Sequence, residues 1–142
     1  MDEASSPGRG IVRLFEGLSP ADVADLGRHY AHGAYFKDPF NEVRGLAAIQ
    51  RIFAHMFESL EAPRFKVLSL LEQDGQAFVT WDFEFGLRGR MLKIHGASHL
   101  RFAPDGRVNY HHDYWDAAEQ VYERVPLLGG LLRLLRRRLA AR

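Results

Sequence analysis

The spacing of apolar residues changes from helical to strand-like about half-way along the chain. Apolar residues recur every three or four positions within residues 11–18 and, most strongly, within residues 46–60, which predicts an amphipathic helix in each segment. Between these segments, Ser19 and Pro20 form a helix-start signal. The apolar residues that follow predict a second short helix with one apolar face: Val23, Leu26 and Tyr30. Residues 33–45 place two aromatic residues before an Asp-Pro pair and predict an extended segment that stops at the proline.

From Pro63 onward, apolar and polar residues alternate. The alternation predicts four strands, separated by turn-forming sequences, at about 64–72, 76–86, 91–102 and 107–115. Helices followed by an antiparallel meander predict an α+β fold, in which N-terminal helices pack on one face of a curved, mainly antiparallel sheet. No repeat or linker is present, so we expect one domain over residues 10–124, after a disordered start at residues 1–9.

Residues 125–142 predict a basic amphipathic C-terminal helix. Leucines recur every four residues from Leu127 to Leu139, and most of the arginines fall on the opposite side. Residues 131–142 hold five Arg and no acidic residue, so the remainder of the chain has 14 basic against 18 acidic side chains. Such an acidic body disfavours binding to nucleic acid. We expect the helix to cap its own domain or a partner copy, and we rank contact with an anionic membrane second.

The composition mainly serves to exclude several kinds of site and of protein. The 142 residues are 46% hydrophobic and 12% aromatic, which suffices for a buried core, and none is cysteine. Disulfides, thiolate metal sites and cysteine nucleophiles are thereby excluded. Apolar stretches are shorter than the ~20 residues that span a bilayer, and the N-terminus has no apolar signal core. We therefore expect a cytoplasmic protein, and nothing in the pattern indicates a cofactor.

Three local motifs follow one another along the chain. They are Tyr35-Phe36-Lys37-Asp38-Pro39 with Arg44-Gly45, then Ile94-His95-Gly96-Ala97-Ser98, then Asp105-Gly106-Arg107-Val108 running into His112-Asp113-Tyr114-Trp115-Asp116. Over residues 10–120 this order resembles the nuclear transport factor 2-like superfamily, also called SnoaL-like, which includes ketosteroid isomerases, polyketide cyclases and limonene epoxide hydrolase. The resemblance implies a cone-shaped half-barrel, an apolar pocket for a small hydrophobic molecule, and a homodimer formed through the outer sheet face.

Asp38 is the first candidate for chemistry. The resemblance to ketosteroid isomerases implies that an aspartate followed by proline, just before the long helix, is a general base. A carboxylate in an apolar pocket has the raised pKa that such a base needs. The two hydrogen-bond donors of those enzymes do not carry over, because their positions fall on Leu14 and Ser98. The alternative, which we rank slightly ahead, is a turn in which the Asp38 carboxylate caps nearby backbone N–H groups.

Asp113 is the second candidate. Limonene epoxide hydrolase resembles this chain in its last strand, where an aspartate belongs to an Asp-Arg-Asp set that opens the epoxide. Asp113 matches one acid, and Asp82 matches the other if the hairpin is three residues shorter than in that enzyme. The arginine position then falls on Thr80, so epoxide hydrolysis ranks low. His111 shares the strand face of Asp113 and is a candidate partner acid or base. The alternative is a structural Asp113, hydrogen-bonded to a neighbouring strand or to His111.

Seven histidines raise the question of a metal site. His111 and His112 are adjacent on a predicted strand and point to opposite faces, so both cannot bind one ion without a bulge. No histidine spacing typical of a zinc site is present. We therefore predict no metal.

The aromatic residues of the predicted strand at 76–86 leave one ambiguity. Trp81, Phe83 and Phe85 share one face, and the polar residues between them share the other. Burial favours the aromatic face inside the cone, whereas a gapless match to ketosteroid isomerase places it outside, in a dimer contact. The predicted ligand-binding residues are mostly aromatic: Phe15, Tyr30, Phe36, Phe57, Trp81, Ser98 and Trp115.

Four functions fit these patterns. The first is an enzyme of the isomerase or cyclase kind, with Asp38 or Asp113 as general base and His111 as a partner. The others are a binding module for a hydrophobic ligand, a homodimeric interaction protein, and a protein that binds membranes through its C-terminal helix. Whether the chain is an enzyme stays open, and we rank a ligand-binding or enzymatic pocket first.

Overall fold

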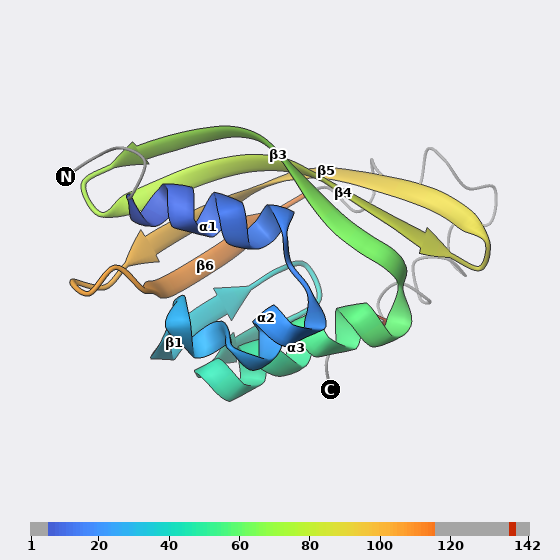
Figure 1. The fold of residues 1–142 in the computed structure, drawn as a ribbon, viewed down its shortest axis with the longest axis horizontal. Coiled ribbons are helices and arrows are strands. Elements are labelled where there is room, and N and C mark those ends of the chain that lie inside the picture. Colours follow the sequence, from blue (N-terminus) through green and yellow to red (C-terminus); the bar gives the residue numbers. More distant parts are fainter. Residues whose placement is uncertain (1–5, 116–136, 139–142) are drawn as a thin grey trace.

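The computed structural model of the chain describes residues 6–115 and 137–138. The first half contains α1 (Pro7–Glu16), α2 (Pro20–Ala24), the 3-10 helix η2 (Leu26–Arg28), β1 (Tyr30–Lys37), β2 (Glu42–Arg44) and α3 (Leu46–Ser59). Four longer strands follow: β3 (Glu61–Gln73), β4 (Gln76–Leu87), β5 (Arg90–Phe102) and β6 (Val108–Tyr114). In Figure 1 the helices lie beneath an arched sheet.

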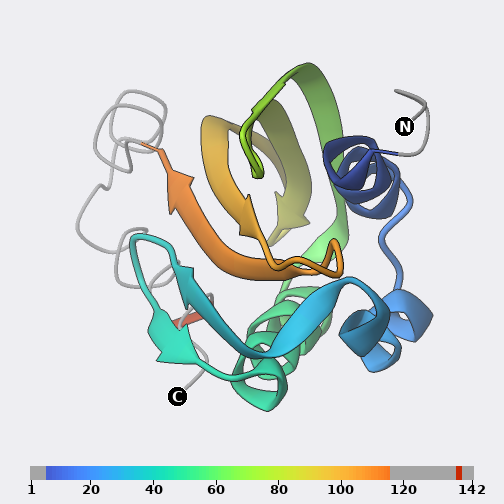
Figure 2. The same ribbon diagram turned by 90° about the vertical axis from the view of Figure 1, so that its left-hand side faces the viewer.

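The six strands form one curved, unclosed sheet in the order β2-β1-β6-β5-β4-β3. Strands β3 to β6 form the predicted antiparallel meander, whereas β1 pairs with β6 in parallel. Figure 2 shows the sheet curling around its concave side, where α1 and α3 lie. The predicted α+β class and the cone-shaped half-barrel are therefore confirmed.

Side-chain caps set the starts of the first two helices. Ser6 Oγ accepts the N–H of Arg9 at the start of α1. Ser19 and Asp22 form a reciprocal capping box, where the sequence predicted a helix start. Because α1 begins at Pro7, residues 7–9 are helical, which corrects the disordered start predicted for them. Residues 1–5 of that prediction lie outside the described part of the chain.

Tyr30 is the first residue of β1, not a member of the predicted helical face. Helix α2 already ends at Ala24, and the N–H of Val108 donates to the backbone oxygen of His29 at 2.8 Å. This pairing with the start of β6 overrides the helical spacing. The extended segment predicted at residues 33–45 is a short hairpin, in which β1 pairs with β2 across a turn that contains Asp38.

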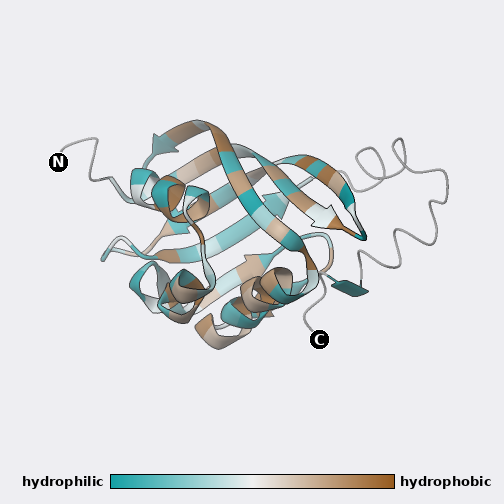
Figure 3. Cartoon of the chain, turned by 45° about the vertical axis from the view of Figure 1, so that its right-hand side comes forward, coloured by the Kyte–Doolittle hydropathy of each residue, from teal (hydrophilic) through white to brown (hydrophobic). Residues whose placement is uncertain are grey.

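The aromatic face of β4 points to the concave side of the sheet. Trp81, Phe83 and Phe85 are buried in the core, whereas Asp82 lies on the outer face, 3.0 Å from His95 Nδ1. Figure 3 shows the alternation of hydrophobic and hydrophilic residues along the strands that results. The preference from burial was therefore correct, and the outward placement from the gapless match to ketosteroid isomerase is wrong.

The predicted basic helix at residues 125–142 lies almost entirely outside the residues that the structure describes. Residues 137–138 are helical, and His55 Nε2 on α3 lies 3.3 Å from the backbone oxygen of Arg137. Within residues 6–115 and 137–138, no helix is long and apolar enough to span a membrane.

Candidate functional site

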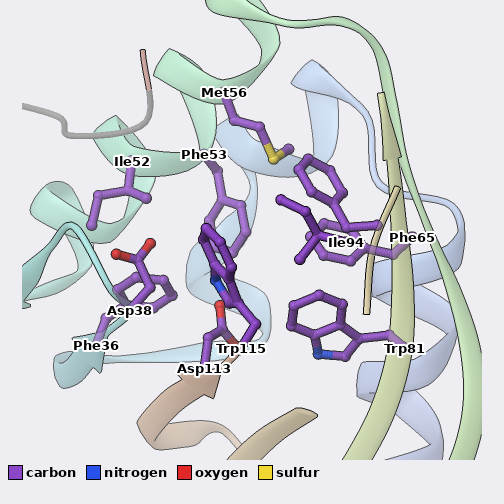
Figure 4. Close-up of a pocket in the computed structure, with 11 residues that line it drawn as sticks. Phe36, Asp38, Ile52, Phe53, Met56, Phe65, Trp81, Ile94, Asp113 and Trp115 are labelled. Carbon is purple, nitrogen blue, oxygen red and sulfur yellow. The ribbon is translucent and has the colours of Figure 1, made fainter. Parts of the chain in front are cut away.

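A small cavity lies between α3 and the inward-facing side chains of the sheet (Figure 4). Its volume is about 60 Å³, which is room for roughly four to six water-sized groups at the ~10–15 Å³ that each requires. Two carboxylates stand in a wall that is otherwise aromatic and aliphatic. The lining residues are Phe36, Asp38, Ile52, Phe53, Met56, Phe65, Trp81, Phe83, Ile94, Asp113 and Trp115.

Asp38 reaches this cavity from the turn between β1 and β2. Its Oδ1 accepts the backbone N–H of Phe40 at 2.8 Å and that of Asn41 at 2.7 Å. Its Oδ2 accepts one long hydrogen bond of 3.3 Å from Asn41 Nδ2. The carboxylate thus caps its own turn, as the alternative interpretation predicted, and lines the cavity as well. Burial, reinforced by the negative charge of Asp113, raises the pKa of Asp38 to about 6, although these hydrogen bonds act to lower the pKa.

Asp113 reaches the cavity from β6, beside β5 in the sheet. Its Oδ1 accepts hydrogen bonds from Ser98 Oγ at 2.5 Å and from His111 Nε2 at 2.6 Å. Ser98 is the residue of β5 directly opposite Asp113, and His111 is two positions away on the same inward face. Both partners lie behind the cavity wall and fix the orientation of the carboxylate.

A buried chain of hydrogen bonds leads from β1 to Asp113. Tyr30 is fully buried, and its hydroxyl lies 2.7 Å from His111 Nδ1. Burial, together with the charge of Asp113, raises the pKa of Tyr30 well above its usual value, so the phenol keeps its hydrogen. On the other side of the ring, His111 Nε2 lies 2.6 Å from Asp113 Oδ1, so the imidazole joins the phenol to the carboxylate.

A second chain reaches Asp113 from β4. Trp81 Nε1 donates to Ser98 Oγ at 2.9 Å, and the Ser98 hydroxyl in turn donates to Asp113 Oδ1. Gly96 lies opposite Trp81 in the sheet and leaves room for the indole ring, because a Cβ there would lie 2.5 Å from Trp81 Cη2. The donor hydrogens of Trp81 and Ser98 are therefore both used within the wall.

The structure brings five of the ten predicted site residues to the cavity: Phe36, Asp38, Trp81, Asp113 and Trp115. Tyr30, Ser98 and His111 form the hydrogen-bonded layer behind the wall. Phe15 packs on His111, with 5.7 Å between the ring centroids, and does not line the cavity. Phe57 packs against the core, also outside the cavity lining.

Six lining residues were not predicted, and the positions of three of them depend on the register of the strands. Phe65, Phe83 and Ile94 form one row across β3, β4 and β5, which no local pattern predicts. Ile52, Phe53 and Met56 lie on the buried side of α3, where the helical spacing did offer a signal. Among the residues that the structure describes, no group of three or more His, Asp or Glu side chains is placed to hold a metal ion.

Comparison with known proteins decides the family. Residues 11–111 match the SnoaL-like domain. The chain belongs to the SnoaL-like family. The matched segment includes Asp38 and His111 and runs from α1 into β6. No curated protein matches the sequence.

Solved structures similar to this SnoaL-like chain share its fold at low sequence identity. An LEH-like epoxide hydrolase of M. tuberculosis has a TM-score of 0.70 and 15% identity, and the alignment covers 91% of this chain and 94% of that one. A putative SnoaL-like polyketide cyclase from Jannaschia sp. has a TM-score of 0.69 and 16% identity, and the alignment covers 84% of this chain and 93% of that one. A hypothetical protein with a ketosteroid isomerase-like fold from Catenulispora acidiphila, in complex with trimethylamine, has a TM-score of 0.70 and 14% identity, with 83% and 91% covered.

Proposed function

We propose that this SnoaL-like protein binds a small, largely apolar molecule in the cavity and that Asp38 acts on it as a general base. The observation that carries the proposal is a carboxylate in an apolar wall whose pKa is raised to about 6. A base with that pKa is ionised at neutral pH and is still basic enough to accept a proton from carbon. General bases are most effective when their pKa lies close to the working pH.

The proposed reaction is proton transfer between two carbons of the ligand. An oxygen of Asp38 forms an O–H bond with a proton from an acidic C–H group, and the electron pair of that bond passes into an adjacent π system of the ligand. The carboxylic acid then returns the proton to a second carbon. Asp38 is regenerated, and the ligand is isomerised without gain or loss of atoms. Oδ2 is the better placed oxygen, because Oδ1 holds two backbone N–H groups of the turn.

Asp113 supports this base through its charge, and it is also the alternative base. Its orientation is fixed by His111 and Ser98, and its negative charge contributes to the raised pKa of Asp38. Two carboxylates whose environments differ in this way are suited to separate acid and base roles.

The same geometry argues against two activities of related proteins. Leu14 is buried in the core and the Ser98 hydroxyl donates to Asp113, so neither supplies the donor that steroid isomerisation needs. The cavity of about 60 Å³ is also far below the ~300–1,000 Å³ of pockets for drug-sized ligands. Asp82, the proposed second acid of an epoxide hydrolase, lies on the outer face of the sheet and is bound to His95.

Binding without chemistry is the second candidate. The hydrogen bonds that tie Asp38 Oδ1 to Phe40 and Asn41 favour it, because they give this carboxylate a structural role that needs no substrate. The two candidates differ in one property, which is whether Asp38 exchanges a proton with the ligand.

Hydrogen–deuterium exchange into a panel of small ketones in D₂O tests the general base directly. The wild-type protein is expected to label the carbon next to the carbonyl, and Asp38→Asn is expected to slow labelling by about 10²–10⁴-fold. Asp82→Asn is the matched control, since it removes an aspartate from the outer face, and it is expected to label at the wild-type rate. Labelling that is absent in the wild-type protein, or unchanged in Asp38→Asn, would contradict the proposal.

We also propose that the chain forms a homodimer through the outer face of the sheet. Aromatic rings on that face form a continuous band, which we call the outer ring band: Tyr35, Phe78, His99, Tyr110, His112 and Tyr114. Phe78 and Tyr114 in this band are about half exposed. Exposed aromatic patches of this kind are typical of protein interfaces. A cytoplasmic location stays a prediction from the sequence.

A further inference from the structure

The wall of the cavity combines negative charge with aromatic rings. Of the eleven lining residues in the described part of the chain, two are aspartates, six are aromatic and three are aliphatic, and none is Lys, Arg or His. Figure 4 shows Asp38 and Asp113 directed toward the same space as Trp81 and Trp115. Aromatic rings present a negative face, so the rings and the carboxylates favour the same sign of charge in a ligand.

The cavity wall offers hydrogen-bond acceptors to a ligand and few side-chain donors. Asp38 and Asp113 are acceptors when ionised. The side-chain donors nearest to them are already used, because Trp81 donates to Ser98, and both Ser98 and His111 donate to Asp113. A ligand that brings only acceptors and a negative charge, such as a carboxylate, would find few side-chain donors here. A ligand that brings positive charge and N–H or polarised C–H groups would match the wall.

The two carboxylates also repel each other. The negative charge of Asp113 is one cause of the raised pKa of Asp38, and burial is the larger cause. The charged group that faces Asp38 from β6 is Asp113, while α3 presents Ile52, Phe53 and Met56 to the same space. Among the described residues, neither carboxylate forms an ion pair with a lysine or arginine. A cation in the cavity would relieve this repulsion.

From these observations we infer that the cavity selects a small organic cation of the alkylammonium class, held between the carboxylates of Asp38 and Asp113 and the faces of the surrounding rings. The inference rests on the proposed function, since it names the ligand class of the same cavity. The volume of about 60 Å³ fits a cation of roughly four to six non-hydrogen groups, at ~10–15 Å³ for each water-sized group. Tetramethylammonium is the simplest probe of that size.

Tryptophan fluorescence measures binding at this site, because Trp81 and Trp115 are the two tryptophans of the chain and both line the cavity. The wild-type protein at pH 8 is titrated with tetramethylammonium chloride and, separately, with tert-butanol, which is a neutral molecule of similar shape. Sodium chloride at the same concentration corrects for ionic strength. We expect saturable binding of the cation, at least ten-fold tighter than that of tert-butanol.

The variants test whether the carboxylates are responsible. Asp38→Asn is expected to lower the affinity for the cation at least ten-fold and to leave the affinity for tert-butanol unchanged. Asp82→Asn is expected to bind both probes with the affinity of the wild-type protein. Equal affinity for the two probes in the wild-type protein would overturn the inference and leave the proposed apolar site standing. Binding of neither probe would also overturn it, and the deuterium-exchange experiment would then decide the proposed function separately. The comparison of the two probes uses the wild-type protein alone, so its result stands even if a variant fails to fold.

Discussion

His111 and Asp113 lie two residues apart on β6 and are joined by a hydrogen bond of 2.6 Å between His111 Nε2 and Asp113 Oδ1. Alternation along the strand points both side chains inward, while His112 between them points outward. The imidazole is 2% exposed, and its Nδ1 is hydrogen-bonded to the Tyr30 hydroxyl at 2.7 Å. One buried ring therefore connects the first residue of β1 to a carboxylate of the cavity wall.

Tyr30→Phe tests this connection. The substitution removes the hydroxyl and leaves His111 Nδ1 buried without its partner, so we expect a loss of about 1–3 kcal/mol in the free energy of unfolding. Urea unfolding followed by circular dichroism measures the loss. Tyr35→Phe is the matched control, because the Tyr35 hydroxyl donates to Glu42 on the exposed surface, and we expect a change within about 0.5 kcal/mol there. Equal losses in the two variants would refute the structural role of the Tyr30 hydroxyl.

The raised pKa of Asp38 predicts a specific dependence of stability on pH. Between about pH 4 and 6 the folded chain holds a proton on Asp38 that the unfolded chain has released, so the stability contribution of Asp38 falls as the pH rises through this window. A shift from 3.8 to about 6 corresponds to about 3 kcal/mol, at ~1.4 kcal/mol for each pKa unit. The cost is complete above the folded-state pKa and absent below pH 4.

Asp38→Asn removes this titration and keeps an oxygen for the turn. The stability of the wild-type protein relative to Asp38→Asn should therefore be higher at pH 4 than at pH 7, by about 3 kcal/mol. Urea unfolding at a series of pH values measures this difference. Asp105→Asn should show the opposite sign and only below about pH 4, because hydrogen bonds from Arg107 lower the pKa of Asp105 from its usual 3.8. A difference for Asp38→Asn that does not vary with pH would contradict the raised pKa.

The proposed homodimer predicts that a charge in the outer ring band weakens self-association. The ring of Phe78 stacks on His99, with 4.3 Å between the centroids, and Phe78 is 48% exposed. Phe78→Glu would bury a carboxylate in an apolar contact, so we expect the dissociation constant of the dimer to rise at least ten-fold. Sedimentation velocity measures the association. Met91→Glu, at a 71% exposed residue beside the β4–β5 turn, is the control. A wild-type protein that stays monomeric at all concentrations would refute the dimer.

Most of the helices and strands could be predicted from local patterns in the sequence. The helix at residues 46–60 and the four later strands depend on spacing between near neighbours, and the structure reproduces them within a few residues. The parallel pairing of β1 with β6 has no such signal, because it joins residues about eighty positions apart in the sequence. Tyr30 illustrates the consequence, since its helical spacing after Ser19 is real but the pairing with β6 places it in a strand.

The residues of the candidate site likewise divide into those that a local sequence pattern identifies and those that depend on strand pairing. Asp38 was identifiable from the turn-forming Asp-Pro pair, and the shared face of His111 and Asp113 from alternation along a strand. Phe65 and Ile94 could not be identified, because their place in the wall depends on the register of β3, β4 and β5. Ser98 was predicted to bind a ligand, yet its hydroxyl donates to Asp113. The sequence analysis did offer a hydrogen bond from Asp113 to a neighbouring strand or to His111, and both are present, but it could not name Ser98 as the partner because that depends on the register of β5 and β6.

Gly96 provides the sharpest test of how the wall is packed. A Cβ at Gly96 would lie 2.5 Å from Trp81 Cη2 and 2.9 Å from the backbone oxygen of Tyr114, so Gly96→Ala must displace the indole or the strand. We expect a loss of about 1–3 kcal/mol in the free energy of unfolding and an altered tryptophan emission. Gly33→Ala in β1 is the matched control, because a Cβ there meets nothing within 4 Å. Combining Gly96→Ala with Trp81→Phe, which removes the clashing ring, should cost less than the sum of the two single losses. Gly96→Ala that is no more destabilising than Gly33→Ala would show that the indole does not occupy this position.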